Sequence, residues 1–147
     1  MYKIILKEQG FTLLEMLLVL AVLMAIVAIS IPGYQNRMVQ KEEQRFFEVL
    51  QQDVYFAQSQ SYASKQTAKI IFREPKGSYE IFTDLQSVAV SRKLPATVTL
   101  KKTSNLNEIY FNSNGSVVQS GTFRFATNSG EKTVVVHLGR GRVVFSE

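Results

Sequence analysis

One carboxylate, Glu15, lies within an otherwise apolar stretch near the N-terminus. Residues 16–29 are all apolar, and the longer segment 13–31 has only Glu15 and Ser30 as polar positions. As a helix, this segment would be about 28 Å long, close to the roughly 30 Å hydrocarbon thickness of a bilayer. A carboxylate within such a helix costs about 2.5–3.5 kcal/mol on membrane-insertion scales. We therefore expect a membrane-spanning segment in which Glu15 needs a partner.

Other residues able to do chemistry are sparse. The chain has a single histidine, His137, and no cysteine, which excludes Cys-based zinc sites, iron–sulfur clusters and thiol nucleophiles. His137 lies in an alternating, strand-like stretch and has no second histidine with which to share a metal. No G-x-S-x-G motif occurs, and the GRGR segment at 139–142 lacks the third glycine of a dinucleotide loop. The sequence predicts a protein that is not an enzyme and that holds no metal and no cofactor.

The N-terminal residues form a motif with a known counterpart. A short charged leader, MYKIILKEQ, precedes Gly10, Phe11, Thr12 and the carboxylate at 15, and the apolar run follows at once. This arrangement resembles the class III signal of type IV pilins and pseudopilins. The match includes the glycine before the cut, the aromatic residue after it, and a proline, Pro32, at the twenty-second position after the cut.

The resemblance implies a processing and assembly pathway. A prepilin peptidase would cut between Gly10 and Phe11 and methylate the new amino group of Phe11. Glu15 would then pair with the N-terminal amine of a neighbouring subunit, which offsets the burial of both charges. Thr12 and Pro32 belong to the same assembly segment. The implied partners are the other pseudopilins of the filament, the prepilin peptidase and the cytoplasmic membrane.

Two other interpretations of the N-terminus remain open. Ala28-Ile29-Ser30 is a tolerable small-x-small cleavage site for a secretory signal, and the apolar run could also be a plain membrane anchor. Lys3 and Lys7 precede the run, which favours a cytoplasmic N-terminus and a single pass that delivers the rest of the chain outside. After assembly, the pilin-like interpretation places the chain in a filament at the cell surface.

The remaining sequence predicts an α+β fold, in which a long N-terminal helix packs on a C-terminal antiparallel β-sheet head. Residues 33–65 continue the helix with one apolar stripe, and the residues expected on that stripe are Val39, Glu43, Phe46, Phe47, Leu50, Val54 and Ala57. Period-two patterns then predict strands over 68–73, 78–83, 97–101, 108–111, 122–126, 133–138 and 142–145. The expected organisation is a leader over 1–10, a transmembrane and assembly helix over 11–32, its amphipathic continuation over 33–65, and the β head over 66–147. We expect Pro32-Gly33 to bend or loosen the helix, and Leu138 to face inward with Val134 and Val136.

The net positive charge of the chain is compatible with a nucleic-acid partner. With 17 basic and 12 acidic residues the chain has a net charge of +5. A basic patch able to contact DNA phosphates would consist of Arg92, Lys93, Lys101, Lys102, Arg140 and Arg142. The alternative is an ordinary solvated β surface.

The C-terminal stretch VVVHLGRGRVVFSE resembles that of H-type minor pseudopilins and of the competence pseudopilins of Gram-positive bacteria. The resemblance implies a minor structural subunit of the competence pilus, the filament that takes up transforming DNA. Two alternatives stay open: a minor pseudopilin of a type II secretion system, and a solitary membrane-anchored extracellular binding domain.

Overall fold

The computed structural model describes residues 11–84, 87–139 and 142–146, without the side chains at 30–36 and 75. The expected leader and its two lysines lie outside the described residues, and the expected membrane segment is described with its side chains as far as Ile29. The chain divides into two compact units, Met1–Met38 and Val39–Glu147.

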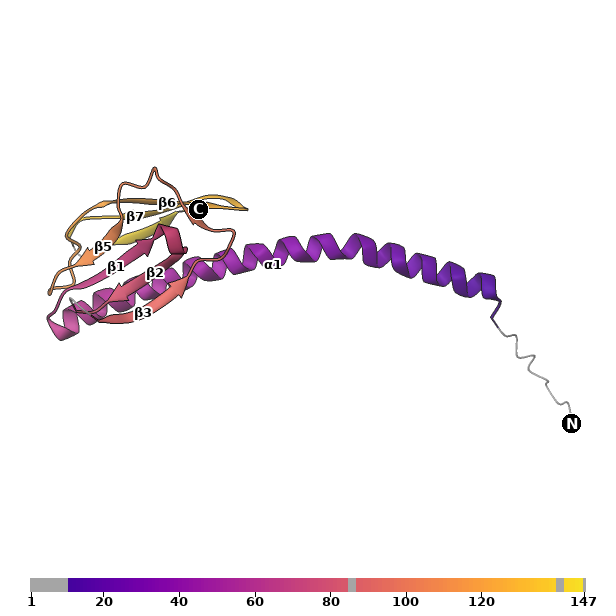
Figure 1. Cartoon of the computed structure of the whole chain (residues 1–147), viewed down its shortest axis with the longest axis horizontal. Coiled ribbons are helices and arrows are strands. Elements are labelled where there is room, and N and C mark those ends of the chain that lie inside the picture. The colour runs from indigo at the N-terminus through magenta and orange to yellow at the C-terminus, as the bar shows by residue number, and fades with distance from the viewer. Residues whose placement is uncertain (1–10, 85–86, 140–141, 147) are drawn as a thin grey trace, which may run out of the picture. The chain divides into compact units, whose positions relative to one another are not determined.

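A single long helix, α1 (Leu13–Ser64), is the first element of the chain (Figure 1). It begins two residues after Phe11, the start that the sequence predicts, and it continues without interruption past Gly33. It ends where Lys65 adopts a left-handed backbone conformation, with φ of 56°, as is common just after a helix C-terminus. Within the part of the chain that the structure describes, no helix combines the length and the apolar content that crossing a membrane requires.

The second unit contains two antiparallel four-stranded sheets. The first has the order β3-β2-β1-β5, with β1 (Ala68–Arg73), β2 (Ser78–Phe82), β3 (Val88–Lys93) and β5 (Glu108–Phe111). The second has the order β4-β6-β7-β8, with β4 (Thr99–Leu100), β6 (Gly121–Thr127), β7 (Gly130–Val136) and β8 (Val143–Ser146). A single turn of 3-10 helix, η1 (Glu74–Lys76), joins β1 to β2. The α+β fold predicted from the sequence is confirmed, with α1 followed by an antiparallel β head.

The core of the second unit lies between the helix and the two sheets. Phe46 on α1 packs against Tyr79 of the first sheet and Phe125 of the second, with ring centroids 6.2 and 6.3 Å apart. Between the sheets, the rings of Phe72 and Phe123 are 4.9 Å apart. Of the other expected stripe residues, Glu43, Leu50, Val54 and Ala57 are buried, and Val39 and Phe47 are half-buried. The sequence periodicity therefore identifies the face of the helix that packs on the head.

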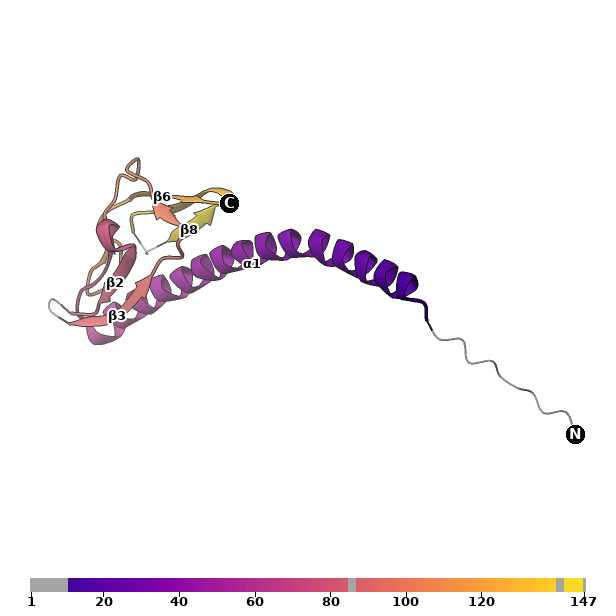
Figure 2. The same cartoon turned by 45° about the vertical axis from the view of Figure 1, so that its right-hand side comes forward.

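The structure differs from the strand predictions at β3, which was not predicted, and at Leu138. β3 has no counterpart among the predicted strands, because five of its six residues are exposed and its pattern lacks a continuous apolar face. Leu138, predicted to face inward, is 63% exposed, because β7 ends at Val136 and the chain turns at Gly139, whose φ is 97°. β3 nevertheless runs beside the C-terminal part of α1 in both views (Figures 1 and 2).

Candidate processing and assembly site

Thr12 caps the N-terminus of α1. Its hydroxyl accepts a hydrogen bond from the backbone N–H of Glu15 at 3.3 Å, and its carbonyl oxygen accepts the N–H of Met16 at 3.2 Å. Threonine satisfies a backbone donor that the first helical turn would otherwise leave without a partner, and the T-x-x-E spacing is that of a capping box. Glu15 lies in the first turn, where the positive end of the helix dipole favours a carboxylate. One side chain thus fixes both the start of the helix and the backbone position of Glu15.

The residues flanking the expected cleavage point are only partly described. Phe11 precedes the helix, and its side chain is 76% exposed. Gly10 lies outside the described residues, as does the side chain of Pro32. Cleavage after Gly10, methylation of Phe11 and the assembly roles of Thr12, Glu15 and Pro32 remain predictions.

The first half of α1 presents apolar side chains on all sides. Every side chain from 11 to 29 is exposed within this chain, including Leu13 at 79% and Ile29 at 80%. A helix that is apolar all round is stable only when lipid or other helices cover it. This surface therefore requires partners outside the chain.

Glu43 joins the helix to the turn between β6 and β7. One carboxylate oxygen accepts the backbone N–H of Asn128, and the other accepts the hydroxyl of Ser129, each at 2.8 Å. Burial opposes ionisation of this carboxyl, but these hydrogen bonds, with a further one from Thr97, outweigh it and lower the pKa of Glu43. The periodicity of the sequence predicts the place of Glu43 on the packing stripe but not its partners, which lie 85 and 86 residues away.

Asp53 joins the helix to the first sheet. Its Oδ2 atom accepts the hydroxyl of Tyr79 at 2.6 Å and the Nε of Arg92 at 2.6 Å, while Nη2 of Arg92 donates to Oδ1 at 3.2 Å. Burial, followed by the bond to the carboxylate, raises the pKa of Tyr79, and the same carboxylate raises the pKa of Arg92. Sequence reasoning missed this cluster, although Asp53 follows Leu50 by three positions and so shares its helix face.

The six basic residues of the expected patch are not equivalent. Arg92 is bound to Asp53, and Lys101 forms an ion pair with Glu131, which Arg124 also approaches at 3.5 Å. Lys93, Lys102 and Arg142 are exposed, while Arg140 lies outside the described residues. Arg92 and Lys93 belong to the edge strand of the first sheet, whereas Lys101 and Lys102 directly follow β4, an edge strand of the second. Contact with DNA by these residues stays a prediction.

His137 follows β7 and is exposed, and its backbone N–H donates to the carbonyl oxygen of Arg142 at 2.9 Å. Among the described residues, no group of three His, Cys, Asp or Glu side chains is arranged to hold a metal ion.

Comparisons with known proteins agree with this architecture. The family described as "Type II transport protein GspH" matches residues 48–140, and the "Prokaryotic N-terminal methylation motif" matches residues 5–31. Competence protein ComGD of Bacillus subtilis (strain 168) is 27% identical over 141 residues, which cover 93% of this chain and 92% of that protein.

Two solved structures share the fold. The type IV minor pilin FimU of Pseudomonas aeruginosa superimposes with a TM-score of 0.58 at 16% identity, over 79% of this chain and 93% of FimU. The minor pseudopilin EpsH from the Type 2 Secretion System of Vibrio cholerae gives a TM-score of 0.56 at 12% identity, over 71% of this chain and 96% of EpsH. The GspH match alone spans more than half of the chain, and the methylation motif lies at the start of α1. The chain therefore belongs to the GspH family, and it is a type IV pilin-like minor pseudopilin, a structural subunit of the kind that is anchored in a membrane and assembled into a filament.

Proposed function

We propose that this chain is a minor pseudopilin of a competence pilus, a structural subunit needed to assemble the filament that takes up transforming DNA. The observation that carries the proposal is the similarity to competence protein ComGD, which extends over nearly the whole of both chains. A match over 93% of the chain must include most of the long helix and of the β head together, rather than one common element.

The proposed pathway begins at the membrane. The precursor is inserted as a single-pass protein with its N-terminus inside, and a prepilin peptidase removes residues 1–10 and methylates Phe11. The exposed apolar surface of residues 11–29 supports this step, because lipid covers it before assembly and other helices cover it afterwards. The subunit then moves from the cytoplasmic membrane into a filament at the cell surface.

Within the filament, Glu15 sets the axial position of the helix by pairing with the N-terminal amine of a neighbouring subunit. The Thr12 cap supports this role because it holds the backbone N–H of Glu15 in the first helical turn. A buried charge pair stabilises one register strongly, since any shifted register leaves both charges without partners. The β head forms the outer surface.

The test is deletion of the gene in its native host, followed by complementation with the intact chain. Loss of transformation with normal protein secretion is the expected result, and mass spectrometry of the complementing protein should find a methylated Phe11 as its first residue. Normal transformation after deletion would contradict the proposal.

A second candidate is a minor pseudopilin of a type II secretion system. The GspH family description and the shared fold with EpsH favour it. The same deletion strain separates the two candidates, because a secretion subunit would retain transformation and lose the export of specific extracellular proteins. An intact Met1 in the mature protein would exclude the processing step of both.

A further inference from the structure

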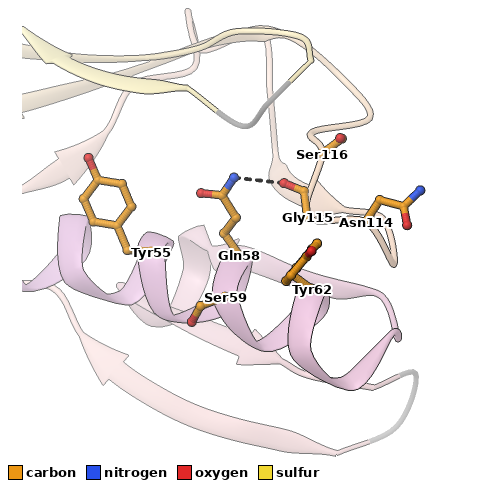
Figure 3. A pocket seen from close by; sticks show the side chains of 7 residues that line it. All are labelled: Tyr55, Gln58, Ser59, Tyr62, Asn114, Gly115 and Ser116. Carbon is orange, nitrogen blue, oxygen red and sulfur yellow. Dashed lines mark hydrogen bonds between the residues drawn. The ribbon is translucent and has the colours of Figure 1, made fainter.

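A pocket opens between α1 and the turn that follows β5. It has a volume of about 450 Å³ and is lined on the helix by Tyr55, Gln58, Ser59 and Tyr62 and on the turn by Asn114, Gly115 and Ser116 (Figure 3). The volume lies within the range of about 300–1,000 Å³ that is usual for small-ligand sites. All seven residues belong to the second unit. None of them is part of the processing and assembly site.

Two tyrosines stand at the ends of this pocket on one face of the helix. Tyr55 is 53% exposed and Tyr62 is 61% exposed, so neither is needed to fill the core. They are seven positions apart, which places them about 10.5 Å apart along the helix axis. Lys65 lies over the ring of Tyr62, with Nζ 4.0 Å from the centroid. One face of the Tyr62 ring is therefore covered by Lys65. The helix offers two exposed tyrosine side chains with Gln58 between them (Figure 3).

Hydrogen bonds hold the opposite wall of the pocket in place. The Oδ1 atom of Asn112 accepts the backbone N–H groups of Asn114 and Ser116, each at 3.0 Å, and Nε2 of Gln58 donates to the carbonyl oxygen of Gly115 at 2.9 Å. Gly115 has a φ of +72°, and a Cβ there would lie 3.4 Å from Cβ of Tyr62. Glycine therefore lets the turn approach the helix closely, and the pocket is formed before any ligand arrives.

The chemistry of the lining selects a class of ligand. All seven lining residues are uncharged, and the one cation described beside them, Lys65, lies over the ring of Tyr62, so a phosphate chain would find no charged partner on either wall of the pocket itself. Amides and hydroxyls both donate and accept hydrogen bonds, as do the hydroxyls of sugars, and tyrosine rings stack on the C–H faces of pyranose rings. From these features we propose that the pocket binds a neutral oligosaccharide. The separation of the tyrosines exceeds the length of one sugar ring, so the ligand has at least two linked rings.

The test uses the full-length processed chain in a detergent without a sugar head group. The probes are N-acetylchitotetraose and maltotetraose, with binding followed by saturation-transfer NMR and by tyrosine fluorescence, since the chain has no tryptophan. We expect binding of at least one of the two tetrasaccharides that does not weaken as salt rises. Tyr55→Ala and Tyr62→Ala should each lower the affinity by about tenfold.

Phe56→Ala is the matched control, because Phe56 is an exposed aromatic residue of the same helix that does not line the pocket, and it should change the affinity by less than about twofold. Circular dichroism establishes that each variant is folded. Failure of the folded chain to bind either tetrasaccharide at millimolar concentration would overturn the proposal. Binding that is unchanged in both tyrosine variants would do the same. So would tyrosine-dependent, salt-sensitive binding of single-stranded oligothymidylate in place of sugar.

Discussion

The Nε atom of Arg92 donates a hydrogen bond to Oδ2 of Asp53 at 2.6 Å, and Nη2 donates to Oδ1 at 3.2 Å, so both oxygens of one buried carboxylate hold the edge strand β3 against α1. Tyr79 donates its hydroxyl to the same carboxylate from the adjacent strand β2. Such two-point contact between guanidinium and carboxylate is among the strongest side-chain hydrogen-bonding arrangements in proteins. It also means that Arg92 has a structural partner already.

Replacing Arg92 with Ala should lower the free energy of unfolding by about 1–3 kcal/mol, because the buried carboxylate of Asp53 would keep Tyr79 but lose its cation. The Arg92 side chain is 45% exposed, and solvent screening keeps the loss below that of a fully buried pair. Urea unfolding of the full chain measures the effect. Lys93→Ala is the control, since Lys93 is the exposed neighbour on the same strand and should cost less than about 0.5 kcal/mol. Equal losses in the two variants would contradict the assignment.

Acid should weaken the attachment of the helix to the β6–β7 turn. The pKa of Glu43 is lower in the folded chain than its ordinary value of 4.5, so at pH values between the two the unfolded chain binds more protons. The stabilisation from Glu43 is therefore fully present above the ordinary value and is lost as pH falls through the folded pKa. Urea midpoints measured from neutral pH down to about pH 3 should show this loss.

Glu43→Gln provides the control for that titration, because glutamine keeps the shape of the side chain but does not titrate. The variant should be less stable at neutral pH and should show a shallower dependence on pH below 4.5. A variant with the same acid dependence as the parent chain would assign the effect to other carboxyl groups.

Loss of the Thr12 hydroxyl should loosen the first turn of α1. Thr12→Val removes the oxygen that accepts the N–H of Glu15 and should cost about 0.5–2 kcal/mol of local helix stability. Amide hydrogen exchange at Glu15 in the micelle-bound chain should become faster, whereas Thr12→Ser should preserve the protection. Unchanged exchange in the valine variant would mean that the cap does not hold this turn.

Glu15→Ala should separate processing from assembly. Cleavage and methylation should continue, because the proposed cut between Gly10 and Phe11 lies outside the Glu15 side chain, but the amount of subunit in sheared filaments should fall strongly. Mass spectrometry and immunoblotting of the filament fraction measure the two steps. Glu42→Ala, at an exposed acidic position of the same helix, should behave as the parent chain does. Normal incorporation of the Glu15 variant would rule out its role in setting register.

If the head binds DNA, the affinity should fall steeply as salt rises, and the exposed residues Lys93, Lys102 and Arg142 should carry the binding. Replacing all three with Ala should reduce the slope of log affinity against log salt by about 0.9 for each phosphate that is no longer neutralised. Fluorescence anisotropy with duplex DNA measures this slope, and Lys41→Ala on the helix is the control. Absence of binding at low salt would show that DNA is not a partner of this head.

The helix and most strands could be predicted because their signals are local. The spacing of Phe46, Leu50 and Val54 identifies the packed face of α1 from within one segment, and the strands 68–73 and 108–111 agree with β1 and β5 at both ends. The cap of α1 is local too, since Thr12 and Glu15 are three residues apart. Features of this kind need no knowledge of how distant segments pair.

The remaining features depend on partners far away in the sequence. The bond between Asp53 and Arg92 spans 39 residues, and the bond between Glu43 and Asn128 spans 85. The alternation of apolar and polar residues also cannot show where strand pairing ends. It therefore predicts that Leu138 faces inward, although β7 ends two residues earlier, at Val136. β3 could not be predicted because Val90 is the one residue of this edge strand that is not exposed, and backbone pairing with β2 and the bond from Arg92 to Asp53 hold the rest of the strand.

The two buried carboxylates of α1 bind different sheets. Asp53 holds β2 and β3 of the first sheet, and Glu43 holds the β6–β7 turn of the second, about 15 Å away along the helix axis. Tension applied to this part of the helix is therefore divided between two attachment points that belong to separate hydrogen-bonded ladders. Tearing this part of the helix from its head requires both attachments to fail together with the apolar contacts of Phe46, Leu50 and Val54, so two side chains remote in sequence from the N-terminal motif add to the mechanical strength of the head.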